Sequence, residues 1–171
     1  MQNSKIKIVD EKFTRFEAKI IQQEIAQSPD ITGYSLRELL RLKRVFKAYS
    51  GKDFAGACAN FDFSRNWTEL SAYIVLNKYR GQGIGKLLFK AAFQDAVSRG
   101  RNIYIVSRNP AMIKIFRKED FKIIRSFWQL PPEVKLDTLI FAISWYRAKE
   151  FFRKLPMKKS GKFIFGIKMA A

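Results

Sequence analysis

The stretch Trp67–Gly100, WTELSAYIVLNKYRGQGIGKLLFKAAFQDAVSRG, decides the fold of this chain. Its first part, up to Leu76, is rich in β-branched and aromatic residues and predicts a strand. Its last part repeats apolar residues at helical spacing up to Ser98, and Gly100 follows where a helix commonly ends. Between the two lies a turn with three glycines and basic residues. The stretch therefore predicts a strand, a tight turn and a helix in succession.

The turn has the composition of a phosphate-binding loop. Gly81, Gly83 and Gly85 can adopt dihedral angles that other residues avoid, and they let a ligand approach the backbone closely. The first N–H groups of a helix lack partners within the helix and carry a partial positive charge, and Arg80 and Lys86 flank them here. These features predict a pyrophosphate site. The alternative is a turn whose glycines serve packing alone.

Two common phosphate motifs do not fit this turn. A P-loop that ends at Gly85-Lys86 would need a glycine at position 80 and a serine or threonine at 87, where the chain has Arg80 and Leu87. The dinucleotide pattern G-x-G-x-x-G would need a third glycine at Lys86 or Leu88. Residue identity excludes both motifs.

The pattern that fits is Arg-x-x-Gly-x-Gly, formed by Arg80, Gly83 and Gly85. It resembles the coenzyme-A-binding motif of the GNAT superfamily of acyl-CoA N-acyltransferases, and the resemblance is specific from about Glu69 to Phe121. It implies an α/β fold with a mixed central sheet, whose two parallel strands splay apart and are flanked by helices. It also implies acetyl-CoA as cofactor, with contacts from Ile74, Val75, Arg80, Gly81, Gln82, Gly83, Ile84, Gly85, Lys86, Asn109 and Phe116.

Composition limits the other possibilities. The 171 residues are enough for one domain with a substantial core, and we expect a single domain over 1–171, in which 128–171 is the less typical part. The chain has no histidine and one cysteine, which excludes histidine catalysis, an intrachain disulfide and cysteine-cluster metal sites. No apolar run reaches membrane-spanning length and Met1–Lys5 lacks a signal-peptide pattern, so we expect a cytoplasmic monomer or homodimer without a metal.

The net charge of +18 exceeds what one anionic cofactor requires. The excess favours an acidic partner, an anionic membrane surface or a nucleic acid such as tRNA. A basic surface that only confers solubility is the alternative, since charge alone does not identify a partner.

Further strands are predicted at 5–9, 44–49, 54–63, 102–107 and 121–127, and helices at about 13–26, 36–40 and 110–118. Beyond Pro131 the apolar spacing predicts one long helix to about Lys154, and 162–168 predicts a last strand at the edge of the sheet. This segment either closes the core or forms a basic, aromatic surface for an acceptor or a membrane.

Transfer to an amine requires a base, because an alkyl amine with a pKa of ~10.4 is mostly protonated at neutral pH. Strand alternation places Glu69, Ser71 and Tyr73 on one face. Relatives carry a catalytic glutamate at the place of Glu69, so we expect Glu69 to be the base, directly or through water. An exposed carboxylate paired with a lysine is the alternative. The resemblance further implies an oxyanion donor in the backbone of Ile74 or Val75.

The chain departs from the family at the acid that protonates the leaving thiolate. Many members have a tyrosine in the pattern Asn-(x)6-Tyr-(x)4-Phe, which here is Asn109, Phe116 and Phe121. Phe116 cannot donate a proton, so either Tyr73 or Tyr104 replaces the tyrosine or the thiolate leaves unaided.

Two functions follow from these observations. The first is an acetyl-CoA-dependent N-acetyltransferase that uses direct attack by a primary amine in a ternary complex. Its acceptor is a small molecule, a protein amine or, in view of the charge, an aminoacyl-tRNA. The second is a non-catalytic acyl-CoA-binding or interaction module, which the missing tyrosine favours.

Overall fold

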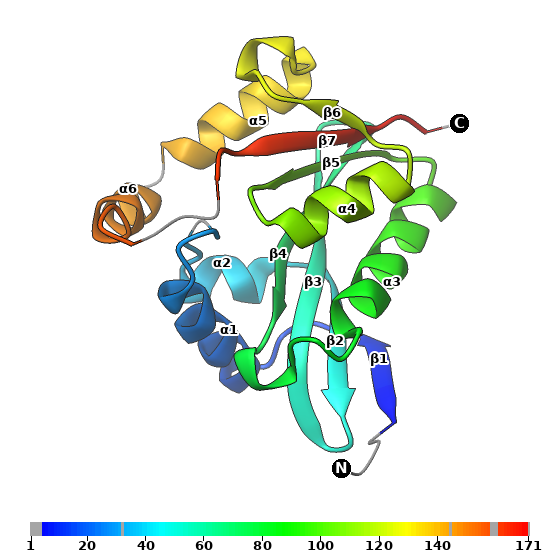
Figure 1. Ribbon diagram of the computed structural model, residues 1–171, viewed down its shortest axis with the longest axis vertical. Coiled ribbons are helices and arrows are strands. Elements are labelled where there is room, and N and C mark those ends of the chain that lie inside the picture. Colours follow the sequence, from blue (N-terminus) through cyan, green and yellow to red (C-terminus); the bar gives the residue numbers. More distant parts are fainter. Residues whose placement is uncertain (1–4, 32, 144, 158–160, 171) are drawn as a thin grey trace.

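The computed structural model of the protein describes residues 5–31, 33–143, 145–157 and 161–170 (Figure 1). The expectation about the first residues, Met1–Ser4, lies outside this part. The strands are β1 (Ile6–Asp10), β2 (Arg44–Ser50), β3 (Asp53–Phe63), β4 (Trp67–Val75), β5 (Asn102–Ser107), β6 (Lys122–Ile124) and β7 (Ile164–Lys168). The α-helices are α1 (Arg15–Gln27), α2 (Leu36–Arg41), α3 (Ile84–Ser98), α4 (Pro110–Lys118), α5 (Pro132–Ala142) and α6 (Trp145–Arg153). Short 3₁₀ turns lie at Asn77–Tyr79 and Phe127–Gln129.

The strands form one mixed sheet in the order β1-β2-β3-β4-β5-β7-β6. The neighbours β4 and β5 run parallel and pair only from Trp67–Glu69 to Asn102–Tyr104. Beyond Glu69, β4 has no recorded pairing with β5, so the two strands diverge toward their carboxyl ends. The predicted mixed sheet with splayed parallel strands is confirmed.

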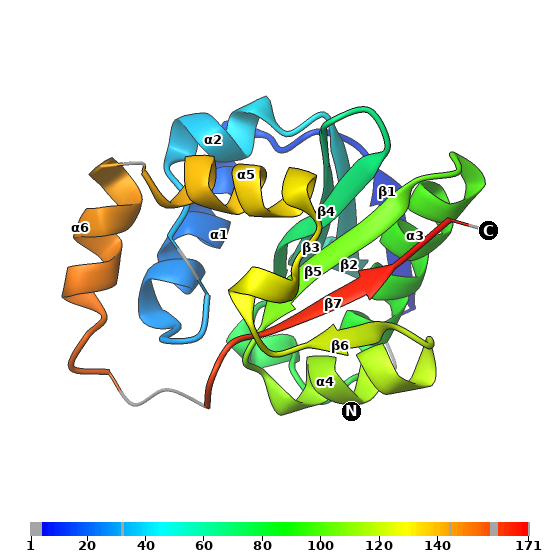
Figure 2. The same ribbon diagram turned by 90° about the horizontal axis from the view of Figure 1, so that it is seen from above.

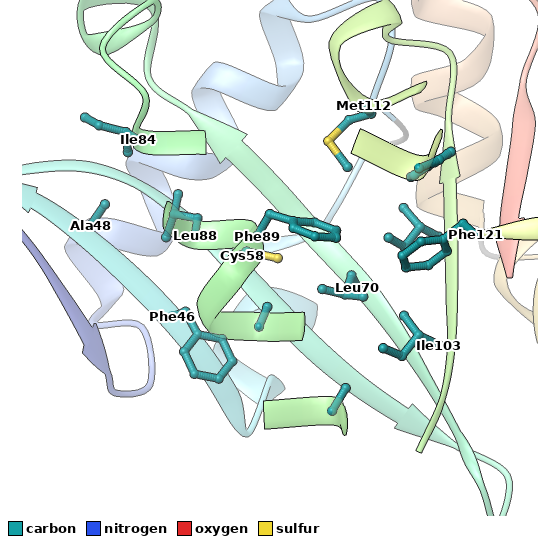
Figure 3. Packing of buried hydrophobic residues seen from close by; sticks show 14 of the residues in the cluster. Phe46, Ala48, Cys58, Leu70, Ile84, Leu88, Phe89, Ile103, Met112 and Phe121 are labelled. Atoms are coloured by element: carbon teal, nitrogen blue, oxygen red, sulfur yellow. The ribbon is translucent and has the colours of Figure 1, made fainter. Parts of the chain in front are cut away.

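Helices cover both faces of the sheet (Figure 2). The helices α3 and α4 pack on one face through a core that includes Leu88, Phe89, Met112 and Phe121 (Figure 3). The helices α1 and α2 cover the opposite face over β2 to β4. On that same face, α5 packs through Val134 over the β5–β7 half of the sheet. The described chain therefore forms one sheet between two helical layers.

The strand β4 contains a bulge, and the bulge overturns one expectation from the sequence. Ala57 pairs with Ile74 and Ala59 with Ser71, so two residues of β4, Ala72 and Tyr73, lie opposite one residue of β3. Ala72 has a positive φ of 45°. The extra residue reverses the alternation, because a bulge shifts the following side chains to the other face. Tyr73 therefore packs with the α3 core rather than on the face of Glu69, and the prediction that the two share a face was wrong.

The C-terminal segment differs from its prediction in two ways. The strand β7 is not an edge strand: it lies between β5 and β6 and pairs antiparallel with both. The expected long helix is divided into α5 and α6, which separate after Ala142. We attribute the division to tertiary contacts, because α6 and the residue after it bind to α2 and to the loop that follows α1. Arg147 pairs with Glu38 of α2 at 2.7 Å, and the Lys154 ammonium donates to the Ile31 carbonyl at 2.9 Å.

Two further findings concern the described residues only. None of their helices combines the length and apolarity needed to cross a membrane. No three of their Cys, Asp or Glu side chains gather in a way that could hold a metal ion.

An ion pair buried between α1 and β2 gives a stability prediction. The Lys47 ammonium is 2% exposed and lies 3.2 Å from a carboxylate oxygen of Glu17, whose side chain is 7% exposed. Although burial raises it, hydrogen bonds from Tyr49, Thr14 and Lys47 lower the pKa of Glu17 below its usual value. Because the folded state favours the charged carboxylate, Glu17 stabilises the fold at pH values above the ordinary pKa of glutamate. This contribution to the free energy of unfolding is lost as the pH falls through the lowered pKa.

We expect Glu17→Gln to lower the free energy of unfolding by about 3 kcal/mol, since it removes the buried carboxylate and leaves the buried Lys47 ammonium with only the exposed one of Glu11. Urea unfolding measures the effect at neutral pH, and the difference from wild type should shrink on acidification. The matched control is Glu11→Gln, which removes a carboxylate at the same 3.2 Å distance from Lys47 but with 67% exposure. That variant should cost less than about 1 kcal/mol. Equal losses in both variants would contradict the assignment.

Candidate functional site

The turn between β4 and α3 has an open backbone. Gly81 and Gly83 have φ values of 79° and 78°, in the region that favours glycine. A Cβ added to either residue would have no atom within 4 Å, so this side of the turn is free space. Gly83 stands at the N-cap of α3 and provides no side-chain cap for the first amides of the helix. The predicted glycine turn thus leaves helix N–H groups accessible to a ligand.

A cavity of about 800 Å³ lies in front of this turn. Most of the predicted cofactor residues line it: Ile74, Val75, Arg80, Gly81, Gly83, Ile84, Gly85, Lys86 and Asn109. Two of the predicted residues do not line it, namely Gln82 and Phe116. Eight of the nine residues that line it lie between Ile74 and Lys86, so one short segment places them around the cavity. Asn109 comes from the start of α4.

The cations around the cavity have different surroundings. The guanidinium of Arg80 donates to the Val75 carbonyl at 3.1 Å and to a Glu24 carboxylate oxygen at 3.0 Å, so it braces the turn against β4 and α1. Lys86 lines the cavity from α3, and Lys114 and Lys118 line it from α4. The sequence analysis did not include Lys114 and Lys118, although their spacing of four residues places them on one face of a helix.

Asn109 and Phe116 both belong to the segment around α4, and each side chain makes contacts that stabilise the fold. The Asn109 side chain caps α4 by accepting a hydrogen bond from the Ala111 amide at 2.9 Å, while the residue also borders the cavity. Phe116 is fully buried against Phe121, with a ring-centroid distance of 5.6 Å. A Cβ on Gly166 would lie 3.2 Å from the Phe116 ring, so β7 covers this side chain. Phe116 is therefore part of the core and not of the cavity wall.

A second cavity of about 400 Å³ lies in the gap between the diverging strands β4 and β5. It shares Tyr73, Ser107 and Met112 with the first cavity, so the two adjoin at these residues. Glu69 lines it from β4, Tyr34 from the loop before α2, and Tyr104 from β5. Its outer wall comes from the C-terminal segment, through Asp137 and Thr138 of α5, Arg147 of α6, and Phe163 and Phe165.

Glu69 is a buried carboxyl group that faces this second cavity. The residue is 6% exposed, and within the described part of the chain no hydrogen bond or ion pair reaches its carboxylate. Burial and the nearby negative charge of Asp137 raise the pKa of Glu69 to about 8, against a smaller opposing effect of Arg147. The alternative of an exposed carboxylate paired with a lysine is therefore wrong. A carboxyl group with this pKa exchanges protons near neutral pH, as a general base must.

The two tyrosines considered as acids are placed differently. The Tyr73 hydroxyl donates to the Gly85 carbonyl at 2.7 Å, and the side chain borders both cavities. The Tyr104 hydroxyl lies 3.3 Å from Oγ1 of Thr138 and borders only the second cavity. Burial raises the pKa of both hydroxyls above the usual tyrosine value. Tyr73 is thus the tyrosine at the junction, on the opposite face of β4 from Glu69.

Solved structures with this fold include several acetyltransferases. Rv2747 of Mycobacterium tuberculosis, in complex with CoA and NLQ, matches with a TM-score of 0.67 and 13% identity over 95% of this chain and 99% of that chain. N-acetylglutamate synthase of Neisseria gonorrhoeae matches with a TM-score of 0.70 and 13% identity over 99% of this chain but only 36% of its own. The ribosomal-protein-S18-alanine N-acetyltransferase of Escherichia coli matches with a TM-score of 0.60 and 16% identity over 95% and 91%. At these identities the likeness shows the fold alone.

Comparison with curated protein sequences finds no significant match. The family model described as Acetyltransferase (GNAT) family matches residues 17–121, which is more than half of the 171-residue chain. The matched region contains the glycine turn, both diverging strands and Glu69, and it ends before α5, α6 and β7. The chain therefore belongs to the acetyltransferase (GNAT) family.

Proposed function

We propose that the protein is an N-acetyltransferase that moves an acetyl group from acetyl-CoA to a primary amine by direct attack in a ternary complex. One observation carries the proposal. Glu69 is a buried carboxylate with no partner among the described residues, and it faces the smaller cavity, which adjoins the larger cavity at the glycine turn. The first part suits a general base, and the second suits a polyanionic ligand.

The residues of the larger cavity fit coenzyme A. The open amides at Gly83 and the start of α3 suit its diphosphate, and Lys86, Lys114 and Lys118 supply positive charge around the cavity. The volume of about 800 Å³ is within the range of cofactor sites. Structural neighbours of the same family fold were crystallised with coenzyme A. When bound, acetyl-CoA supplies a thioester carbonyl carbon as the electrophile.

Glu69 acts on the amine. It removes the proton of the ammonium form, directly or through water, and so frees the nitrogen lone pair for attack. The bulge at Ala72–Tyr73 redirects the strand that follows it, so that Ile74 and Val75 border the larger cavity. We assign the oxyanion donor to the backbone N–H of Ile74 or Val75. Side-chain replacement would not test that donor.

Tyr73 takes the place of the missing family tyrosine in this proposal. It borders both cavities, whereas Phe116 is in the core. Its hydroxyl protonates the leaving thiolate or positions the turn through Gly85. We expect Tyr73→Phe to lower kcat by about 10²-fold with an unchanged dissociation constant for CoA.

The leaving group separates the two roles of Tyr73. If the hydroxyl protonates the thiolate, an acetyl thioester of a more acidic thiol needs less help, because its thiolate leaves more readily. With that thioester as the acetyl donor, the ratio of the wild-type rate to the Tyr73→Phe rate should then approach one. An equal ratio for both donors would assign Tyr73 to positioning only.

The test of the function itself is acetyl transfer by the purified chain. Acetyl-CoA is incubated with a panel of primary amines, thiol release is followed, and products are identified by mass spectrometry. We expect an N-acetylated amine and one equivalent of free thiol. Tight CoA binding without transfer to any amine would instead support a non-catalytic module. Transfer restricted to aminoacyl-tRNA, with an affinity that falls steeply with salt, would support the nucleic-acid version that the charge of +18 suggests.

A further inference from the structure

We propose that the second cavity, which we name the acceptor cavity, selects a primary monoamine on a compact, ring-bearing apolar body, and that Asp137 binds its ammonium group. The inference deepens the proposed function and rests on it. It goes beyond the family, because Asp137, Arg147, Phe163 and Phe165 all lie outside the matched residues 17–121. The family model therefore says nothing about this wall.

The acceptor cavity contains a surplus of negative charge. Three carboxylates line it, from Asp30, Glu69 and Asp137, against one arginine, Arg147, which pairs with Glu38 at 2.7 Å. Asp30 lies 4.0 Å from Arg108, which is outside the lining and stacks at 3.6 Å over the ring of Phe163. Glu69 and Asp137 are different, because within the described residues neither carboxylate has a hydrogen bond or an ion pair. The charge of Arg147 opposes the raised pKa of both carboxyl groups but is outweighed by burial, so a cationic ligand is still favoured.

The two carboxylates are electrostatically coupled. The charge of Asp137 contributes to the raised pKa of Glu69, so the groups are close enough to repel each other. Burial raises the pKa of Asp137 itself to about 6, against the opposing charge of Arg147. Near neutral pH, Asp137 is therefore mostly charged while Glu69 is mostly protonated. An ammonium ion between them relieves the repulsion and favours the charged form of both.

Asp137 is directed at the cavity by the helix that carries it. Val134, Asp137 and Thr138 have the spacing of one face of α5, and the Val134 side chain is fully buried between this helix and the sheet. The Thr138 hydroxyl is fixed by a hydrogen bond to the Val134 carbonyl at 2.7 Å and by its contact with the Tyr104 hydroxyl. The face of α5 that packs on the sheet is thus also the face that supplies the carboxylate.

The rest of the wall describes the body of the acceptor. Tyr34, Tyr104, Phe163 and Phe165 contribute rings, and Ile31, Val106 and Met112 contribute aliphatic surface. A volume of about 400 Å³ is near the lower end for small-molecule sites, so the body is compact. Apart from Asp30, which lies 4.0 Å from Arg108, a second ammonium group would meet mostly aromatic and aliphatic wall among the described residues. This argues against a polyamine, as does the charge of +18 on the whole chain.

The reaction balances with one monoamine. The ammonium gives one proton to Glu69, the nitrogen forms a bond to the thioester carbonyl carbon, and the carbon–sulfur bond breaks. The sulfur leaves with the electron pair of that bond and takes up the second nitrogen proton, directly or through Tyr73. The products are the N-acetyl amine, free thiol and one proton on Glu69, which is released to solvent.

The test compares an amine with its neutral isostere. Binding of 2-phenylethylamine, 2-phenylethanol and spermidine is measured by calorimetry on the full chain, without acetyl-CoA and with free CoA. We expect wild type to bind the amine at least about tenfold more tightly than the alcohol, because a hydrogen bond to a charged group is the stronger one. Spermidine should bind more weakly than 2-phenylethylamine.

The variant Asp137→Asn should weaken the amine about tenfold and leave the alcohol and CoA unchanged. Because Asp137 has no hydrogen bond or ion pair to lose among the described residues, the thermal unfolding of the variant should match that of wild type. Glu133→Gln, at the exposed start of the same helix, should change none of these affinities. Equal weakening of amine and alcohol, or tighter binding of spermidine, would overturn the inference. Direct binding also separates the two proposals. Binding of 2-phenylethylamine without acetyl transfer would support the acceptor class and contradict the transferase. Acetyl transfer with a preference for spermidine would support the transferase and contradict the acceptor class.

Discussion

Replacement of Glu69 by glutamine is expected to lower kcat/KM for acetyl transfer by about 10²- to 10⁴-fold, the usual contribution of a general base. The reason is that a glutamine amide accepts a hydrogen bond but cannot take the proton of the ammonium group. The larger cavity, which we assign to coenzyme A, does not include Glu69, so the dissociation constant for CoA should not change. A loss of transfer without a loss of CoA binding is the expected pattern.

The pH profile provides the sharper measurement. The raised pKa of Glu69, about 8, means that the free enzyme is mostly protonated at this position below that pH and deprotonated above it. Since only the carboxylate accepts a proton, kcat/KM of wild type should rise with pH and level off above about 8, apart from the titration of the amine itself. In Glu69→Gln this limb should disappear, and only the rise due to the amine, with a pKa of ~10.4, should remain.

Thermal unfolding distinguishes a loss of catalysis in Glu69→Gln from a loss of folded protein. Glu69 has no partner among the described residues, and its burial disfavours the charged form. An uncharged glutamine of the same shape should therefore leave thermal unfolding unchanged or raise its midpoint. The matched control is Glu119→Gln, which removes one carboxylate at the end of α4 away from both cavities. Retention of the wild-type rate and pH limb in Glu69→Gln would remove Glu69 from the role of base.

The parts that the sequence predicted are those governed by local chemistry. The strand, the turn and the helix from Trp67 to Ser98 each have a short-range signal, and all three form close to the expected bounds. The glycine turn is local as well, because backbone freedom at Gly81 and Gly83 depends on those residues alone. For this reason most of the residues that line the larger cavity could be named from the sequence, while their role in binding coenzyme A stays a prediction.

Residue order alone could not give the faces of β4. Period-two alternation is a good guide only while pairing is regular, and one extra residue at Ala72–Tyr73 reverses it. The consequence is functional. Glu69 faces the layer of α1, α2 and α5 and lines the acceptor cavity, whereas Tyr73 packs with the α3 core and borders both cavities from the other side of the strand. A regular strand would have placed both on the acceptor side.

The acceptor cavity depends on contacts between distant parts of the chain. Asp137 and Arg147 are 68 and 78 positions after Glu69, and nothing in their neighbourhood marks them as site residues. They reach the cavity because β7 inserts between β5 and β6 and because α6 is anchored to α1 and α2. The sequence predicted one helix there because apolar spacing continues past Ala142, whereas the division into α5 and α6 is set by tertiary contacts.

The distribution of charge also differs from what the total suggests. The net charge of +18 favours anionic partners at the surface, yet Glu69 and Asp137 in the acceptor cavity have no hydrogen bond or ion pair within the described part of the chain. The two observations are compatible, because a long-range positive field acts on large polyanions while a small monovalent amine responds mainly to the groups it contacts. The acceptor and any partner of the basic surface are therefore separate questions.

Replacement of Gly83 by valine should abolish binding of CoA and, with it, acetyl transfer. Gly83 has a φ of 78°, where a β-branched residue is strongly disfavoured, and it stands at the open start of α3. Its Cβ would project into the free space that we assign to the diphosphate. We expect the dissociation constant for CoA to rise at least about 10²-fold, which corresponds to about 2.7 kcal/mol.

Gly100 provides a matched control at the other end of the same helix. It has a φ of 62°, and a Cβ there also meets no atom within 4 Å, but it borders neither cavity. Gly100→Val should therefore cost a similar 1–3 kcal/mol of backbone strain, measured as about the same fall in the free energy of unfolding. Because only Gly83 lies at the ligand, CoA affinity by calorimetry should fall in Gly83→Val alone. A similar affinity in the two folded variants would mean that the diphosphate does not bind at this turn, and the assignment of the larger cavity to coenzyme A would be lost with it.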